Sequence, residues 1–150
     1  MTEYSEIVAI IAPCGPDCGK CLACSDGEIR RHSQALADLF GPNFAQYAER
    51  FRESNPVFAN YPAFRELLNF LAQGSCRTCR EGPCLFQGCR VRGCVQEEGV
   101  DFCFQGDAFP CHRSGLPARL EAIWRQSNEL RREVGVEEYY ERVKERPRYP

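Results

Sequence analysis

Apolar side chains recur at helical spacing over two long parts of the chain, residues 25–73 and 116–146. In the first part, the i, i+3, i+4, i+7 pattern predicts three helices, the first two ending at Gly41 and before Asn55, and the third at Gly74. We expect their apolar faces to be core. These faces comprise Ile29, Ala35, Leu36, Leu39 and Phe40; Phe44, Tyr47, Ala48 and Phe51; and Phe64, Leu67, Leu68 and Leu71.

The second part predicts a long helix that Gly135 stops, followed by a shorter helix from Val136 to Arg146. The apolar face of the long helix comprises Leu120, Ile123, Trp124, Ser127, Leu130 and Val134. Charged residues of both signs cover the opposite faces, as on a solvated helix surface.

Two stretches do not follow this pattern. Residues 5–13 form a short apolar run that fits either a buried strand or one turn of helix. Residues 76–111 have little helical periodicity, and the alternation over 100–104 suits a short strand that can pair with residues 7–12. The predicted fold class is mainly α: a single helical domain over residues 1–150, with irregular cysteine-rich metal-binding loops and room for one short two-stranded sheet.

Cysteines account for 11 of the 150 residues, and they are grouped. Three follow the spacing Cys14-x3-Cys18-x2-Cys21, in a loop whose glycines and prolines favour tight turns. Seven more lie between residues 76 and 111, beginning with Cys76-x2-Cys79, which is the knuckle spacing of structural zinc sites. We expect the two groups to meet in shared thiolate sites, with Cys24 as a weaker candidate.

Net charge and the N-terminal sequence indicate the cellular compartment and the classes of partner to expect. The formal net charge is −2, which argues against a nucleic-acid surface. The acidic start and the short apolar run after it do not resemble a signal peptide or a membrane helix. We therefore expect a cytoplasmic protein without a membrane or nucleic-acid partner, whose cysteines bind metal rather than form disulfides.

Three functions fit a set of thiolate ligands. The first is a zinc-binding interaction or regulatory module with an unidentified protein partner and with metal as a condition of folding. The second is an iron–sulfur protein that transfers electrons or senses redox state. The third is a metalloenzyme with an open metal site. Arginines among the cysteines are candidates to balance the thiolate charge: Arg77, Arg80, Arg90 and Arg92.

Catalytic motifs of other kinds are missing, since the chain contains no P-loop, GxGxxG, HExxH or GxSxG sequence. The two histidines are weak ligand candidates. His32 lies on a predicted helix surface, and His112 directly follows Cys111, where neighbouring side chains seldom converge on one ion.

The motifs PCGPDCGKC and CRVRGCVQEEGVDFCFQGDAFPC resemble the bacterial and archaeal family called domain of unknown function 3795. The resemblance implies metal binding, usually assumed to be zinc, and no established reaction. It extends the ligand set to Cys14, Cys18, Cys21, Cys76, Cys79, Cys89, Cys94, Cys103 and Cys111. Gly106 stands where the family pattern has a cysteine, so one site should lack a ligand or recruit Cys84, Cys24 or His112 instead.

Overall fold

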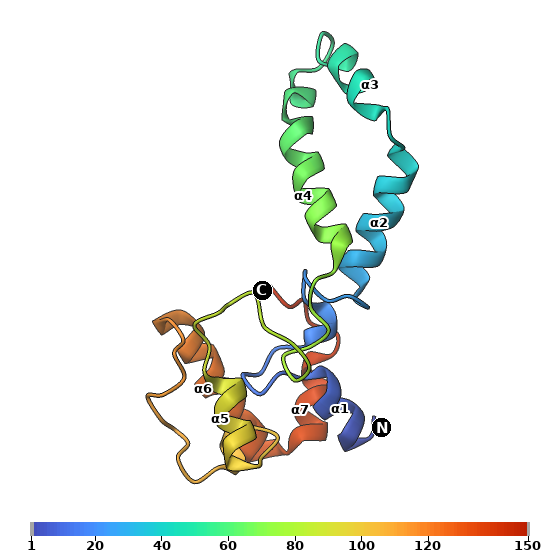
Figure 1. Cartoon of the computed structure of the whole chain (residues 1–150). Coiled ribbons are helices and arrows are strands. Elements are labelled where there is room, and N and C mark those ends of the chain that lie inside the picture. Colours follow the sequence, from blue (N-terminus) through green and yellow to red (C-terminus); the bar gives the residue numbers. More distant parts are fainter. Residues whose placement is uncertain (1, 150) are drawn as a thin grey trace. The chain divides into compact units, whose positions relative to one another are not determined.

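A computed structural model describes residues 2–149, and they form two compact units (Figure 1). The first unit combines Met1–Cys21 with Cys76–Pro150, and the second is Leu22–Ser75. The expectation of one domain over the whole chain stays a prediction, because the first unit is itself assembled from both ends of the sequence.

Helices dominate both units, as the apolar spacing predicts. The α-helices of the second unit are α2 (Glu28–Phe40), α3 (Phe44–Phe51) and α4 (Tyr61–Gln73), with a 3-10 turn at Pro56–Asn60. Those of the first unit are α1 (Tyr4–Ile10), α5 (Val91–Glu98), α6 (Ala118–Val134) and α7 (Val136–Val143), with 3-10 turns at Cys18–Lys20 and Cys103–Gln105. No helix between residues 2 and 149 is both long and apolar enough to cross a membrane.

In the second unit α2 and α4 run side by side (Figure 1). Gly41 and Gly74 follow the last residues of these helices with positive φ angles, so both predicted helix ends are correct. Aromatic rings bridge the segments, with Phe40 and Phe44 at a centroid distance of 4.4 Å and Phe44 and Tyr61 at 5.0 Å.

The expected core of this second unit is largely wrong. Ala48, Leu68 and Ala72 are buried, but most of the large apolar side chains remain exposed, Leu39 by 84%. The helices present a face wider than the two-helix contact can cover, so correct periodicity does not ensure burial. The exposed members of the predicted faces include Leu36, Leu39, Tyr47, Phe51, Phe64 and Leu67.

The first unit has a more complete core. Ile7 and Ile11 pack with Phe102, Val136 and Tyr139, so α1 and α7 enclose the loop around residue 102. A second cluster joins Val91, Phe109 and Trp124, whose two aromatic rings meet edge-on at 5.2 Å. The loops that carry the cysteines lie over these two clusters.

Two local predictions for the first unit fail. Residues 91–98 are helical, although Gly93 and the cysteines obscure the apolar pattern. The possible two-stranded sheet is wrong, because residues 4–10 are helical and a 3-10 turn spans residues 103–105. The two segments do meet, through side chains: the Tyr4 hydroxyl donates to Asp101 at 2.8 Å, and Phe102 packs on Ile7 and Ile11.

Candidate metal centre

A cavity of about 260 Å³ in the first unit is lined by four cysteines from distant parts of the sequence. Cys14 comes from the loop after α1, Cys79 from a turn closed by the Thr78 carbonyl, and the other two from the loop before α5. We call this cavity the first thiol pocket. It is lined by Pro13, Cys14, Cys79, Pro83, Cys84, Phe86, Gln87, Cys89, Val91 and Arg92.

A fifth thiol adjoins this pocket through a sulfur–sulfur hydrogen bond. Cys18 begins a 3-10 turn capped by Asp17, whose carboxylate accepts from the Gly19 amide at 2.8 Å. The hydrogen bond from Cys79 lowers the pKa of Cys18, although burial opposes the change, and the same bond raises the pKa of Cys79. The hydrogen bond between the two sulfurs therefore favours the thiolate form of Cys18 and the protonated form of Cys79.

Burial raises the pKa of two of the lining thiols. It raises the pKa of Cys14 to about 12, with smaller contributions from Cys89 and Cys18. Burial also raises the pKa of Cys89, against hydrogen bonds from the backbone of Val91 and Arg92. A thiol-seeking metal ion would therefore have to displace protons as it binds, because only thiolates are ligands.

The loop that carries Cys14 is held tightly against the helices around it. Gly15 has φ +119°, and a Cβ there would lie 2.6 Å from the Cβ of Ser127 on α6, so only glycine fits. The Tyr139 hydroxyl donates to the Gly15 carbonyl at 3.0 Å. Cys14 is thus placed by the packing of the loop on α6 and α7.

The second thiol pocket is smaller, about 20 Å³, and is lined by Cys94, Cys103 and Cys111. Its other lining residues are Val95, Glu98, Val100, Gly106, Ala108 and Phe109. The indole of Trp124 donates to Cys103 Sγ at 3.3 Å, yet burial prevails and raises the pKa of Cys103. Outside the pocket, Cys94 and Cys111 raise the pKa of Arg113 by electrostatic attraction.

A buried arginine, Arg131, lies close to both pockets, although the sequence pattern does not single it out. Arg131 has no exposed surface, and its guanidinium lies 4.5 Å from the ring centroid of Phe102. It donates to the carbonyls of Ala12 and Pro13, just before Cys14, at 3.4 and 3.3 Å. Burial lowers its pKa to about 10, while attraction to Cys14 and Cys103 acts in the opposite direction.

One of the arginines proposed from the sequence lines the first pocket, and a second lies near its thiols. Arg80 donates hydrogen bonds to the carbonyls of Val8, Ile11 and Asp101. It also interacts electrostatically with Cys18 and Cys79. Arg92 lines the pocket and donates one N–H to the Gly82 carbonyl at 2.9 Å. Its Nε is buried and has no hydrogen-bond partner among residues 2–149. A thiolate in the pocket would supply the acceptor that this N–H lacks.

Most of the remaining candidate ligands lie outside the two thiol pockets. Cys21 receives a contact from the Tyr149 hydroxyl at 3.8 Å and lines neither pocket, and neither does Cys76. Cys24 belongs to the second unit. Cys84 lines the first pocket, so it does not replace a ligand at Gly106, and His112 is exposed. In residues 2–149 no group of three or more His, Cys, Asp or Glu side chains is arranged to hold a metal ion, so binding would require the cysteine side chains to move.

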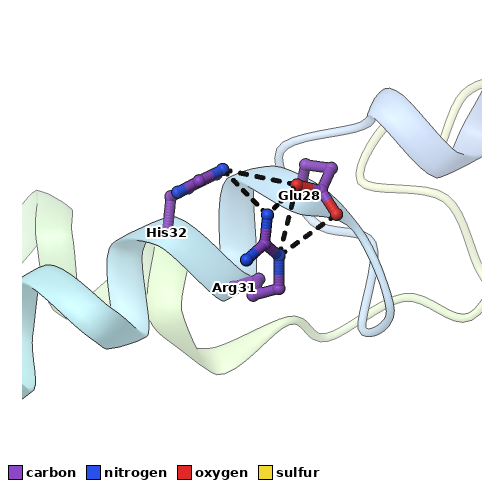
Figure 2. A network of polar contacts seen from close by, with 3 residues as sticks. All are labelled: Glu28, Arg31 and His32. Atoms are coloured by element: carbon purple, nitrogen blue, oxygen red, sulfur yellow. Dashed lines mark hydrogen bonds and ion pairs between the residues drawn. The ribbon is translucent and has the colours of Figure 1, made fainter.

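His32 belongs to an ordinary surface network on α2 (Figure 2). Glu28 contacts both Arg31 and His32, with the His32 nitrogen 3.3 Å from its carboxylate. All three side chains are about two-thirds exposed, 66–69%. The Arg31 hydrogen bond lowers the pKa of Glu28, as expected for a surface ion pair. This network has no part in either thiol pocket.

Comparison with known proteins identifies the family and nothing further. No curated protein and no solved structure matches the chain. The family model described as "Protein of unknown function (DUF3795)" matches residues 10–115, which include all eleven cysteines and both thiol pockets. The chain therefore belongs to the DUF3795 family of proteins of unknown function.

Proposed function

We propose that this chain is a metal-binding protein whose first thiol pocket holds a thiolate-bound metal ion, preferentially zinc. One observation carries the proposal: four cysteines from two distant parts of the sequence line one cavity together with Arg92, whose buried Nε–H has no acceptor among the described residues. Four thiolates are the ligand set of a closed structural zinc site.

The surroundings support a negatively charged centre. A Zn²⁺ ion with four thiolates carries about two negative charges, which cations and N–H donors must offset. Arg92 supplies a donor at the pocket wall, and the half-buried Arg80 and the fully buried Arg131 supply charge nearby. A cavity without a negative charge would give these three cations no electrostatic stabilisation.

An iron–sulfur cluster is the second candidate, for a specific reason. The first thiol pocket, at about 260 Å³, is larger than a single ion requires, and clusters use the same four-cysteine ligand set. Zinc remains first because its site can form by closure of the loops around the ion. Iron, sulfide and visible absorption in protein purified without oxygen would decide for the cluster.

The proposed biochemical role is that of an interaction or regulatory module. The metal would hold together the two sequence segments of the first unit, and the second unit would offer its exposed apolar side chains to a protein partner. A closed four-thiolate site has no position for a substrate, so in this proposal the metal is structural.

The test compares two cysteines that spacing and geometry rank differently. Cys84 lines the first pocket, whereas Cys21 belongs to the predicted spacing motif but lines neither pocket. We expect Cys84→Ser to lose metal from the first pocket, and Cys21→Ser to keep it, as measured by elemental analysis of protein purified with a reductant. Full metal retention in Cys84→Ser, or no bound metal in the unaltered protein, would overturn the proposal.

A further inference from the structure

The second thiol pocket is lined by three cysteines and by no fourth sulfur. Cys94 comes from α5, Cys103 from the 3-10 turn after it, and Cys111 from the loop that follows Phe109. Gly106 also lines the pocket, and it contributes backbone alone. A volume of about 20 Å³ accommodates roughly one water-sized group, since about 10–15 Å³ is enough for one.

The missing side chain at Gly106 is not demanded by the backbone. Gly106 has φ −88° and ψ 151°, an extended conformation that any residue adopts. A Cβ there would meet only the Cys103 carbonyl at 3.6 Å and Val100 Cγ2 at 4.0 Å, both ordinary van der Waals contacts. The position therefore has room for a side chain, and glycine leaves that room open.

No other described side chain is well placed to fill the gap. Glu98 lines the pocket, but its carboxylate lies 3.6 Å from Arg113, in an ion pair at the surface. His112 is exposed and does not line the pocket, and Cys84 belongs to the first pocket. The rest of the lining is apolar, from Val95, Val100, Ala108 and Phe109.

We propose that Cys94, Cys103 and Cys111 form an open three-thiolate metal site whose fourth position, beside Gly106, accepts a small monodentate anion from solution. This inference rests on the proposed metal binding and extends it to a second, different site. Three thiolates on a divalent ion leave about one negative charge, and Arg113 lies near two of the three sulfurs. The small apolar cavity selects against bulky ligands.

Two spectroscopic signals report on the second pocket: the absorption of bound Co²⁺ and the fluorescence of Trp124. Co²⁺ replaces zinc at thiolate sites and gives visible absorption that depends on its ligands. Trp124 is the only tryptophan in the chain, and its indole contacts Cys103, so its fluorescence reports this pocket. Cyanide, a small anion with a single donor atom, is the probe for the open position.

The test uses two substitutions of one residue. Gly106→Cys adds a fourth sulfur, and Gly106→Ala adds the same Cβ without a donor. We expect cyanide to change the cobalt absorption and the Trp124 fluorescence in the unaltered protein and in Gly106→Ala, but not in Gly106→Cys. Gly106→Cys should also bind the second metal ion about tenfold more tightly, which corresponds to about 1.4 kcal/mol.

The possible failures are distinguishable. If Cys94→Ser leaves metal content unchanged while Cys84→Ser lowers it, the second pocket binds no metal and this inference is wrong, although the proposed function stands. If cyanide has no effect on a loaded second site, or Gly106→Cys binds metal no more tightly than Gly106→Ala, the site is closed and the inference is likewise wrong. If the unaltered protein binds neither zinc nor cobalt, both proposals fail.

Discussion

The two units of this protein place their apolar side chains in different ways. The second unit consists of regular helices, yet Leu39, Tyr47 and Leu67 are more than half exposed. The first unit has long irregular loops between its helices, yet it buries Trp124, Phe102 and Arg131 almost completely. Ten of the eleven cysteines belong to the first unit and one, Cys24, to the second.

This difference shows where each unit obtains its order. The second unit depends on local helix formation and on contacts between neighbouring helices, which the sequence pattern captures. The first unit depends on long-range bonds from side chains to loop carbonyls, such as those of Arg80 and Arg131. Its loops carry the thiols, so we expect metal binding to act on the first unit and to leave the second almost unchanged.

Metal removal should give the largest effect and the clearest separation of the units. Apparent binding energies of structural zinc are about 10–16 kcal/mol in finger peptides, and a fraction of that exceeds the stability of many domains. We expect chelation, or Cys79→Ser, to abolish the cooperative unfolding transition seen by Trp124 fluorescence. Much of the helical circular dichroism should remain, because α2, α3 and α4 contain no pocket cysteine. An unchanged Trp124 transition would contradict a structural metal.

Replacement of the buried arginine should give an intermediate effect. Arg131→Met removes the donors to the Ala12 and Pro13 carbonyls and the contact with the Phe102 ring. Hydrogen bonds from charged donors contribute about 1.5–3 kcal/mol each, so we expect a loss of about 2–4 kcal/mol in chemical denaturation. Metal affinity should fall as well, because the loop with Cys14 loses its anchor.

The neighbouring arginine provides the control for this substitution. Arg132 is exposed, and it contacts Phe109 from the surface, with its guanidinium 4.9 Å from the ring centroid. Arg132→Met should cost less than about 1 kcal/mol, the scale of an exposed cation–π contact. Equal losses for the two variants would mean that burial of Arg131 contributes nothing special.

Substitutions on the second unit should give the smallest effect and separate periodicity from burial. Leu39 and Leu68 both lie on predicted apolar faces, but Leu39 is 84% exposed and Leu68 only 6%. We expect Leu39→Ala to change the free energy of unfolding by less than about 0.5 kcal/mol, and Leu68→Ala to cost about 2–4 kcal/mol. Circular dichroism during thermal unfolding measures both, and a large loss for Leu39→Ala would show that its face is covered.

The sequence predicts the helices better than the contacts that they make. The ends at Gly41, Gly74 and Gly135 are correct, because glycine stops a helix through its own backbone freedom. Helix α5 is missed because it is short and Gly93 and Cys94 interrupt its apolar pattern. The alternation over 100–104 reflects Phe102 and Phe104, which stack in the core from a 3-10 turn rather than from a strand.

Spacing likewise identifies the thiols but not their partners. The two cysteine groups do lie together, since Cys14 and Cys18 are close to Cys79, and the family prediction is confirmed. It does not rank Cys84 above Cys21 for the first pocket. It also gives no sign of Arg131, whose helix position resembles that of any surface arginine.

The sequence by itself determined most of the helices, the family and the set of thiols, because these depend on local patterns and on residue identity. Only the tertiary structure decided which thiols share a pocket, which arginines lie near them, and that Gly106 lines the same pocket as Cys94, Cys103 and Cys111. The physical reason is that these neighbours come from loops whose paths depend on packing against α6 and α7, a long-range effect without a local signal.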